Sequence, residues 1–585
     1  MQKSFSKICH TVAQAFSIAA WSLQTFILSI LFFLSICFTV TFKRRGLQLD
    51  HITERVHYNF RFPSQMFLLG TIVFGLILIF FAGQLSKLPR RKMLIALLIY
   101  VFIVQIIWIC ALGLISYAYQ DTRSLIDAAT FLLKGDVGKF DPAYCPQGTV
   151  DSSCIARHIP SPHRYMSYYP FQSGPLLWFV LVFALFGINN LIAFQIVNVI
   201  AITGLVAILW RLGSHLKLKN TGFAAYSLLV ATCVPLLMFC AFVYPNAVGF
   251  AITVAGIGII AEAVRMEKTW KSLLTLAIGF AISGIGIVFK STFQIIILAA
   301  IAAMVITVLY NHRFWQLGAS IIFAAGSFGI SKLPTVIVEH WTGQNFGKGL
   351  PMISWIAIGL GEKEDRGAGW WTGFALRAFK ETNNNYDAQV HISRDFIHQR
   401  IEQFTSHPDD GLRFFTAKLS SEWAEPTFMT GLYSKQGTSW LGFHGLANFI
   451  LTGTGTPYVI AFENISQTVV YLFSIIGCAA FMRSHVRDLT QGARFAQNRF
   501  VQSKTTENNS SLIQQRSSSE VFTQSVLSIS FIGGFLCFTL WEAKGIYTLP
   551  FYILLFPIAA RGIESCIDWV SKDKIPEKIK ISEHE

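Results

Sequence analysis

The sequence predicts an all-α polytopic membrane protein with about 12 transmembrane helices, a juxtamembrane helix and two large external loops. Hydrophobic residues make up 53% of the 585 residues and charged residues only 14%, whereas soluble domains carry about 25% charge. The hydrophobic residues also gather in repeated runs of near 20 residues, which is the length that crosses a hydrocarbon core of about 30 Å.

Each apolar run long enough to span a membrane is expected to form one helix. These spans are Phe16–Phe42, Ser64–Gln84, Met93–Tyr117, Leu191–Trp210, Gly222–Val243, Ala247–Val264, Ser272–Lys290, Phe293–Tyr310, Phe314–Lys332, Ile465–Met482, Val521–Leu540 and Ile546–Ala560. The run Pro175–Phe186 is too short at 1.5 Å per residue and is expected to be interfacial or re-entrant.

Basic residues cluster in short loops, which favours a cytoplasmic side for those loops and for both termini in the cell membrane. The Ser- and Gln-rich stretch near residue 510 is typical of a disordered linker. The expected organisation begins with an N-terminal transmembrane module at 1–333, which contains a first external catalytic loop at 118–173. A large external loop region at 334–463 follows. The chain then continues as a C-terminal transmembrane module at 464–567, with a cytoplasmic disordered linker at 483–520, and as a cytoplasmic tail at 568–585.

The net charge of +15 indicates contact with membrane lipid rather than nucleic acid, because the basic residues lie in loops between spans.

Most cysteines lie in apolar runs, but Cys145 and Cys154 share one polar loop. They form a disulfide if that loop faces an oxidising compartment, and otherwise they are two free thiols.

The polar, acidic loop from Tyr117 to Gln172 lies between long apolar segments, which favours an active-site loop at the membrane surface. Asp121 follows an apolar run directly, so its carboxylate could accept a proton from an attacking hydroxyl. The alternative is that Asp121 caps the helix expected to follow it, since Asp is a preferred capping residue.

Charged residues also occur at the ends of later apolar runs. Lys290 ends one run, where it either contacts a lipid phosphate or extends its ammonium group to the interface. Glu542 and Lys544 lie between two closely spaced runs, either as interfacial charges or as a phosphate contact that Glu542 positions. The Gly-rich stretch ending at Trp370 and Trp371 is expected to expose its indole rings. The histidines are too widely spaced for zinc, so no metal residue is assigned, although a divalent metal stays possible as a cofactor.

Four stretches in order resemble a known family of enzymes. They are Asp121 to Asp136 (DTRSLIDAATFLLKGD), Tyr168 to Gly174 (YYPFQSG), Trp355 to Leu360 (WIAIGL) and Trp541 to Tyr547 (WEAKGIY). They are similar to motifs of bacterial multi-pass C-type glycosyltransferases of the family 39 or mannosyltransferase kind, especially a Gram-positive subgroup.

The resemblance implies transfer of a sugar from a polyprenyl-phosphate-linked donor to a cell-envelope acceptor, a glycan or a protein, on the outer face. It implies that Asp121 is the catalytic base. The donor phosphate would be bound by Lys290, Lys544 and Arg164. Supporting roles would fall to Glu542, Tyr169, Gln172, Trp355 and Tyr547.

The chain departs from the family pattern at two places. Gly545 and Ile546 stand where the family has Ser-Arg, and Asn246 stands where a carboxylate is usual. A non-catalytic accessory protein of envelope glycosylation is therefore one alternative. A transporter or flippase of lipid-linked sugars is another, although most spans lack the central charges typical of ion-coupled transport.

Overall fold

The computed structural model describes residues 2–44, 52–61, 64–113, 120–144, 160–363, 366–436, 444–501 and 517–572. Within these ranges, ten helices are long and apolar enough to cross a membrane, and three further pairs of helices pass the same test but are bent by more than 40°. The chain is therefore an all-α polytopic membrane protein, as the sequence predicts.

The long spans come from α1 (Gln2–Cys37), α2 (Gln65–Leu85), α3 (Arg90–Leu112), α8 (Leu191–His215), α11 (Asn246–Ala263), α12 (Thr269–Phe289), α13 (Gln294–Asn311), α14 (Trp315–Ile330) continued by α15 (Leu333–Thr342), α22 (Thr456–Val501) and α23 (Ser518–Leu540). The bent pairs are α6 (Pro162–Tyr168) with η3 (Pro170–Gln172) and α7 (Ser173–Phe186), α9 (Asn220–Thr232) with α10 (Val234–Met238) and η4 (Phe239–Ala241), and α24 (Gly545–Ile553) with α25 (Phe556–Lys572). The short run Pro175–Phe186, expected to be interfacial or re-entrant, lies in the first pair, which is bent by 114°.

Two expected boundaries are wrong. The first span ends at Cys37, and the chain continues as β1 (Phe38–Arg44), which pairs antiparallel with β2 (Ile52–Phe60). The alternation Phe-Thr-Val-Thr-Phe suits a strand, although hydropathy alone extends the first span through it. Both ends of the segment expected as a linker at 483–520 are helical, because α22 continues to Val501 and α23 begins at Ser518, and residues 502–516 lie outside the described residues.

Glycines let the central spans pack closely. A Cβ atom on Gly286 would lie 2.7 Å from the carbonyl oxygen of Gly249, and one on Gly279 would lie 3.0 Å from that of Gly256. Small residues of this kind allow the backbones of membrane helices to approach. They hold α12 against α11 and so position Lys290 at the end of α12.

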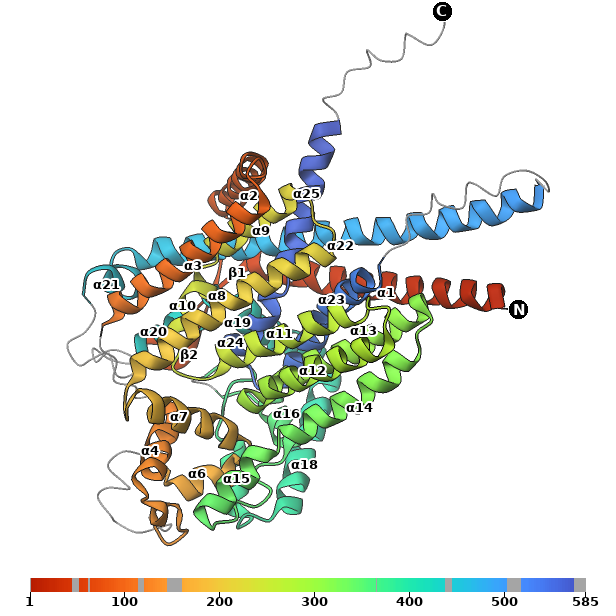
Figure 1. Cartoon of the computed structure of the whole chain (residues 1–585). Helices are drawn as coiled ribbons and strands as arrows, with labels where there is room; N and C mark the ends of the chain where they lie inside the picture. The colour runs from red at the N-terminus through yellow and green to blue at the C-terminus, as the bar shows by residue number, and fades with distance from the viewer. Residues whose placement is uncertain are drawn as a thin grey trace, which may run out of the picture.

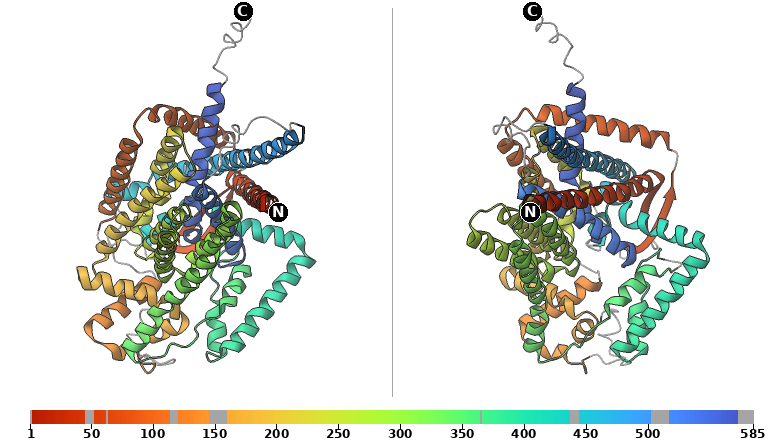
Figure 2. Two further views of the ribbon diagram at one scale, coloured as in Figure 1. Left: turned by 45° about the vertical axis from the view of Figure 1, so that its right-hand side comes forward. Right: turned by 90° about the vertical axis from the view of Figure 1, so that its right-hand side faces the viewer.

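The region predicted as a large loop is mostly helical. It contains α16 (Met352–Leu360), α17 (Phe374–Glu381), α18 (Tyr386–Ser406), α19 (Pro408–Trp423), α20 (Thr430–Gln436) and α21 (Gly445–Leu451). Figure 1 shows α15, α16 and α18 near α4 (Gln120–Lys134), α6 and α7, at one end of the molecule and away from the start of α1. The two views of Figure 2 show the same grouping, so the described part of the first loop shares one end of the bundle with α15, α16 and α18.

Candidate functional site

Two lysines at helix ends approach one tyrosine ring. Lys290 lies in the turn between α12 and α13, and Lys544 immediately precedes α24. The Nζ atoms of Lys290 and Lys544 lie 4.1 Å and 5.8 Å from the centre of the Tyr547 ring. An aromatic face attracts cations, and the start of a helix adds positive potential. The arrangement therefore suits an anionic group.

Carboxylates lie beside these cations. The Glu542 Oε1 atom is 3.6 Å from the Lys544 Nζ atom, and both side chains are buried. Burial, together with nearby Lys544, lowers the pKa of Lys290 to about 8, against the carboxylates of Glu542 and Asp121, which raise it. Lys290 is half-buried and lies within electrostatic range of both carboxylates. We call Asp121, Lys290, Glu542, Lys544 and Tyr547 the Asp121 site.

Asp121 lies in the first turn of α4 and is half-buried. The helix begins at Gln120, so Asp121 is its second residue and lies beside its N-terminal amides, where a carboxylate is favourable. The Thr122 hydroxyl donates a hydrogen bond to the Val243 carbonyl at 3.3 Å, which holds the start of α4 against the stretch before α11. The Asp121 carboxylate is thereby brought within electrostatic range of Lys290 and Tyr547.

The break between α6 and α7 forms another side of the site. The Tyr244 hydroxyl donates to Gln172 Oε1 at 2.6 Å, and both Tyr244 and Tyr169 are within electrostatic range of Asp121. A Cβ atom on Gly174 would overlap the carbonyl oxygen of Val288, two residues before Lys290. The glycine that ends the resembling YYPFQSG stretch therefore permits the contact between α7 and the end of α12.

Aromatic rings connect this break to the last motif. The Tyr169 ring stacks on Trp355 with centroids 6.1 Å apart, and Trp355 stacks on Trp541 at 6.5 Å. Trp371 lies 5.9 Å from Trp355. A row of flat, amphipathic rings of this kind can pack against the apolar face of a sugar.

Lys418 joins two of the motifs and was not expected from the sequence. Its Nζ atom donates to the carbonyl oxygens of Gly359 at 2.7 Å and Trp541 at 2.6 Å, and its side chain is fully buried. A Cβ atom on Gly359 would overlap the backbone of Trp541. Since Lys418 belongs to the amphipathic helix α19 and to no motif, the sequence carries no signal that separates it from a surface lysine.

Several expected residues lie elsewhere or cannot be placed. Arg164 is on α6, half-buried and close to Tyr168, and no described contact joins it to the two lysines. Cys145 and Cys154 lie outside the described residues. Trp370 is fully buried and donates to the Ser421 hydroxyl at 3.0 Å, so the expectation that its ring is exposed was wrong.

The departures from the family pattern also have defined positions. Ile546 is buried in the core, so this position supplies no cation, and Lys290 contacts the adjacent Tyr547 ring instead. Asn246 is buried, and its Oδ1 atom has no hydrogen-bond partner among the described residues. No cluster of three or more His, Cys, Asp or Glu side chains that could hold a metal occurs in the described part of the chain.

Comparison with known proteins adds one structural similarity. No protein-family model matches the chain, and no curated protein matches it. The structure aligns with the apo oligosaccharyltransferase of Archaeoglobus fulgidus at a TM-score of 0.38 and 12% identity, over 83% of this chain and 51% of that chain. The chain thus spans about half the length of the structure it matches, and similarity at this level assigns neither a family nor an activity.

Proposed function

We propose that the protein is a membrane glycosyltransferase that moves a sugar from a polyprenyl-phosphate-linked donor to a cell-envelope acceptor on the outer face. The observation that carries the proposal is the convergence of Asp121, Lys290 and Lys544 around Tyr547. A carboxylate and two cations at the end of a membrane bundle supply a base for an acceptor and a binding site for a phosphate.

The chemistry follows from these two parts. An acceptor hydroxyl oxygen bonds to the anomeric carbon of the sugar while the bond from that carbon to the phosphate oxygen breaks. Asp121 takes the hydroxyl proton. The phosphate leaves with the bonding electrons, and the ammonium groups of Lys290 and Lys544 stabilise its added charge. Glu542 positions Lys544, because the two side chains are buried as a pair.

The stacked rings support binding of the transferred sugar. Tyr169, Trp355 and Trp541 form a row beside the Asp121 site. Gln172 supports the same side through its hydrogen bond with Tyr244. The proposal gives Arg164 a weaker role at the donor, since it lies near Tyr168 and not beside the lysine pair.

The test is release of free polyprenyl phosphate when the purified protein is incubated with a panel of polyprenyl-phosphate sugars and an envelope extract as acceptor. Asp121→Asn should lower the rate by about 10²- to 10⁴-fold, because it removes a general base. The matched control is Asp127→Asn on the same helix, where the carboxylate pairs with Arg123 at 2.9 Å. Full activity in Asp121→Asn, or equal losses in both variants, would refute the catalytic assignment.

A further inference from the structure

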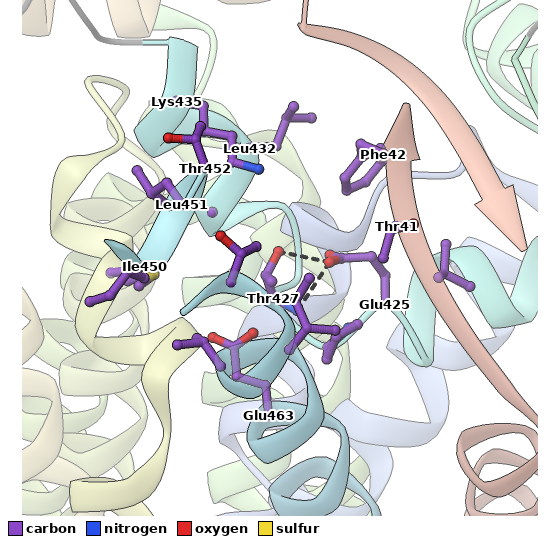
Figure 3. Close-up of a pocket in the computed structure, with 17 residues that line it drawn as sticks. Thr41, Phe42, Glu425, Thr427, Leu432, Lys435, Ile450, Leu451, Thr452 and Glu463 are labelled. Carbon is purple, nitrogen blue, oxygen red and sulfur yellow. Dashed lines mark hydrogen bonds between the residues drawn. The ribbon is translucent and has the colours of Figure 1, made fainter. Parts of the chain in front are cut away.

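A cavity with two glutamates in a mainly apolar lining lies beside the Asp121 site. It has a volume of about 220 Å³. Its walls are β1, residues 425–435 (which include α20), residues 450–452 at the end of α21, and the start of α22 (Figure 3). We call it the Glu463 cavity. At about 30 Å³ per water molecule, it has the volume of roughly seven waters, which is the scale of one sugar ring.

The helix α20 separates the two sites. Leu432 and Lys435 line the Glu463 cavity. Tyr433 instead stacks on Phe242 with centroids 4.2 Å apart and is within electrostatic range of Tyr547. Residues three apart share a helix face and their direct neighbour does not, so one short helix presents different side chains to the two sites.

One of the two glutamates that line the cavity has a structural role. The Glu425 Oε1 atom accepts hydrogen bonds from the Thr427 amide and hydroxyl at 3.1 Å and 2.7 Å, and Oε2 accepts from the Met429 amide at 2.6 Å. Phe428 and Met429 both have positive φ angles, of 46° and 63°. Such angles are costly for residues with side chains, so the Glu425 carboxylate stabilises a strained turn.

The second glutamate has no such partners. Glu463 is 2% exposed, and neither of its carboxyl oxygens has a hydrogen-bond partner among the described residues. The hydroxyl of Thr456, two turns earlier on α22, is also buried without a partner and lines the same cavity. A buried polar group without a partner costs about 1–3 kcal/mol, so these atoms favour hydrogen bonds with molecules that enter the cavity, either water or a bound ligand.

The charges of the lining narrow the class of that molecule. Glu425 and Glu463 repel an anion, whereas the half-buried Lys435 opposes a cation and is within electrostatic range of both glutamates. The remaining lining is mainly apolar, including Phe42 and Ile460. A neutral ligand with several hydroxyl donors and apolar C–H faces satisfies all of these conditions.

We propose that the Glu463 cavity binds a neutral saccharide through the Glu463 carboxyl and the Thr456 hydroxyl. One ring hydroxyl donates to each Glu463 oxygen, and another hydrogen-bonds with Thr456. The apolar side chains of the lining contact the ring carbons. Because α20 stands between this cavity and Asp121, the bound sugar is not the reacting sugar, and binding does not depend on transfer.

The experiment uses the full chain in phosphatidylcholine nanodiscs, because detergents with sugar headgroups would compete for the cavity. Equilibrium dialysis measures binding of radiolabelled methyl α-D-mannoside and methyl α-D-glucoside, with glucosamine and glucose 6-phosphate as cationic and anionic analogues. One site should bind a neutral glycoside. Glucosamine should bind no more tightly, because Lys435 offsets the carboxylates, and glucose 6-phosphate should bind at least about 10-fold more weakly, because its phosphate meets Glu425 and Glu463.

The variants localise the site. Glu463→Gln should weaken binding about 10-fold or more, and Thr456→Val should weaken it severalfold, in line with the loss of hydrogen bonds to a charged and a neutral group. The matched controls are Glu422→Gln and Ser474→Ala, which change buried groups that also lack hydrogen-bond partners but do not line this cavity. Thr456→Val keeps the test valid if Glu463→Gln does not fold.

The outcomes separate this proposal from the transferase proposal. Asp121→Asn should bind the neutral glycoside as the unmodified protein does, even where transfer is lost. Absence of neutral glycoside binding, tighter binding of glucosamine, or binding that Glu463→Gln and Thr456→Val leave unchanged would each overturn the saccharide assignment.

Discussion

The Asp121 site and the Glu463 cavity lie on opposite sides of α20, and they treat buried charge differently. In the Asp121 site, Lys290 and Lys544 face the Tyr547 ring, and Lys544 also faces the Glu542 carboxylate. These residues come from the ends of several helices. In the Glu463 cavity, Glu425 accepts hydrogen bonds from Thr427 and Met429 in its own turn, whereas no other described residue donates to Glu463. The difference follows from where the charges come from: in the first site helix ends from distant parts of the chain bring cations together, which suits the proposed phosphate, whereas in the second one turn binds Glu425 and leaves Glu463 facing the cavity, which suits the proposed neutral ligand.

After the loss of the Asp121 carboxylate, the largest effect is expected from removing the Lys290 charge. Lys290→Gln should lower kcat/KM for the donor by about 10²- to 10³-fold, the cost typical of losing one group that stabilises a developing negative charge. The same change should leave glycoside binding in the Glu463 cavity intact. Equal losses at both sites would show that the two regions are not independent.

The pKa of Lys290 adds a pH dependence to this variant series. Because that pKa is lowered to about 8, donor binding should weaken as pH rises from 7 to 9.5, whereas Lys290→Arg should bind evenly over that range. Stability should move the other way. A lysine whose pKa is lower in the folded state makes folding more favourable as pH rises from about 8 toward its ordinary 10.5. If the melting temperature falls together with donor binding as pH rises, the lowered pKa of Lys290 does not explain the pH dependence.

A smaller effect is expected where α7 meets α12. Gly174→Ala places a Cβ atom on the Val288 carbonyl oxygen, so it should lower stability by about 1–3 kcal/mol and displace Lys290. Gly204→Ala on α8 is the matched control, since nothing lies within 4 Å of its added Cβ. Thermal unfolding followed by circular dichroism, together with donor KM, measures both changes. If Gly174→Ala behaves like Gly204→Ala, close packing does not position Lys290.

Lys418→Met should have an effect on donor binding similar in size to that of Gly174→Ala, confined to the side of the Asp121 site formed by Tyr169, Trp355 and Trp541. It leaves the carbonyls of Gly359 and Trp541 without a donor, at a cost of about 1–3 kcal/mol, and should raise donor KM more than it lowers kcat. As a positioning residue, Lys418 should be partly replaceable by Arg. Glycoside binding in the Glu463 cavity is the readout that should not change.

The smallest effect is expected at the turn that Glu425 holds. Burial raises the pKa of Glu425 to about 7, although the Met429 and Thr427 hydrogen bonds and the charge of Lys435 oppose the increase. The stability contributed by a proton on Glu425 is therefore present below about pH 4.5 and lost as pH rises through 7. Glu425→Gln, which does not ionise, should be less stable at pH 5, by about 1 kcal/mol for a lost hydrogen bond. The difference in stability between the two proteins should narrow by pH 8. A difference that widens with pH would show that Glu425 does not hold a raised pKa in the folded protein.

The spans and much of the Asp121 site were predictable, because both depend on local sequence. Apolar length predicted the membrane helices, and the four resembling stretches contained Asp121, Tyr169, Gln172, Trp355, Glu542, Lys544 and Tyr547. Lys290 was predicted from its position at the end of an apolar run. The β1–β2 hairpin was missed because an apolar strand directly after a helix looks like more helix when only hydropathy is considered.

Lys418 and Glu463 could not be predicted, since nothing near them in sequence distinguishes them. A lysine in an amphipathic helix is usually solvated, and only the packing of α16 against the end of α23 places two carbonyls within reach of Lys418. Glu463 lies near the start of a long helix, where a glutamate would ordinarily face water. The surrounding lining, from β1 to α21, instead buries its carboxyl group in the wall of a cavity, where no other described residue hydrogen-bonds with it.

Composition and apolar run length were enough to define a multi-pass helical membrane protein, because a span must satisfy its own backbone hydrogen bonds and so depends on local sequence alone. Distances between charges depend on which helix ends meet. Folding brought residues 121, 290 and 544 near one tyrosine ring, because helix ends meet where close backbone packing at glycines such as Gly174 lets them approach. Folding also buried the Glu463 carboxyl group in the wall of a cavity, which no local pattern in the sequence indicates.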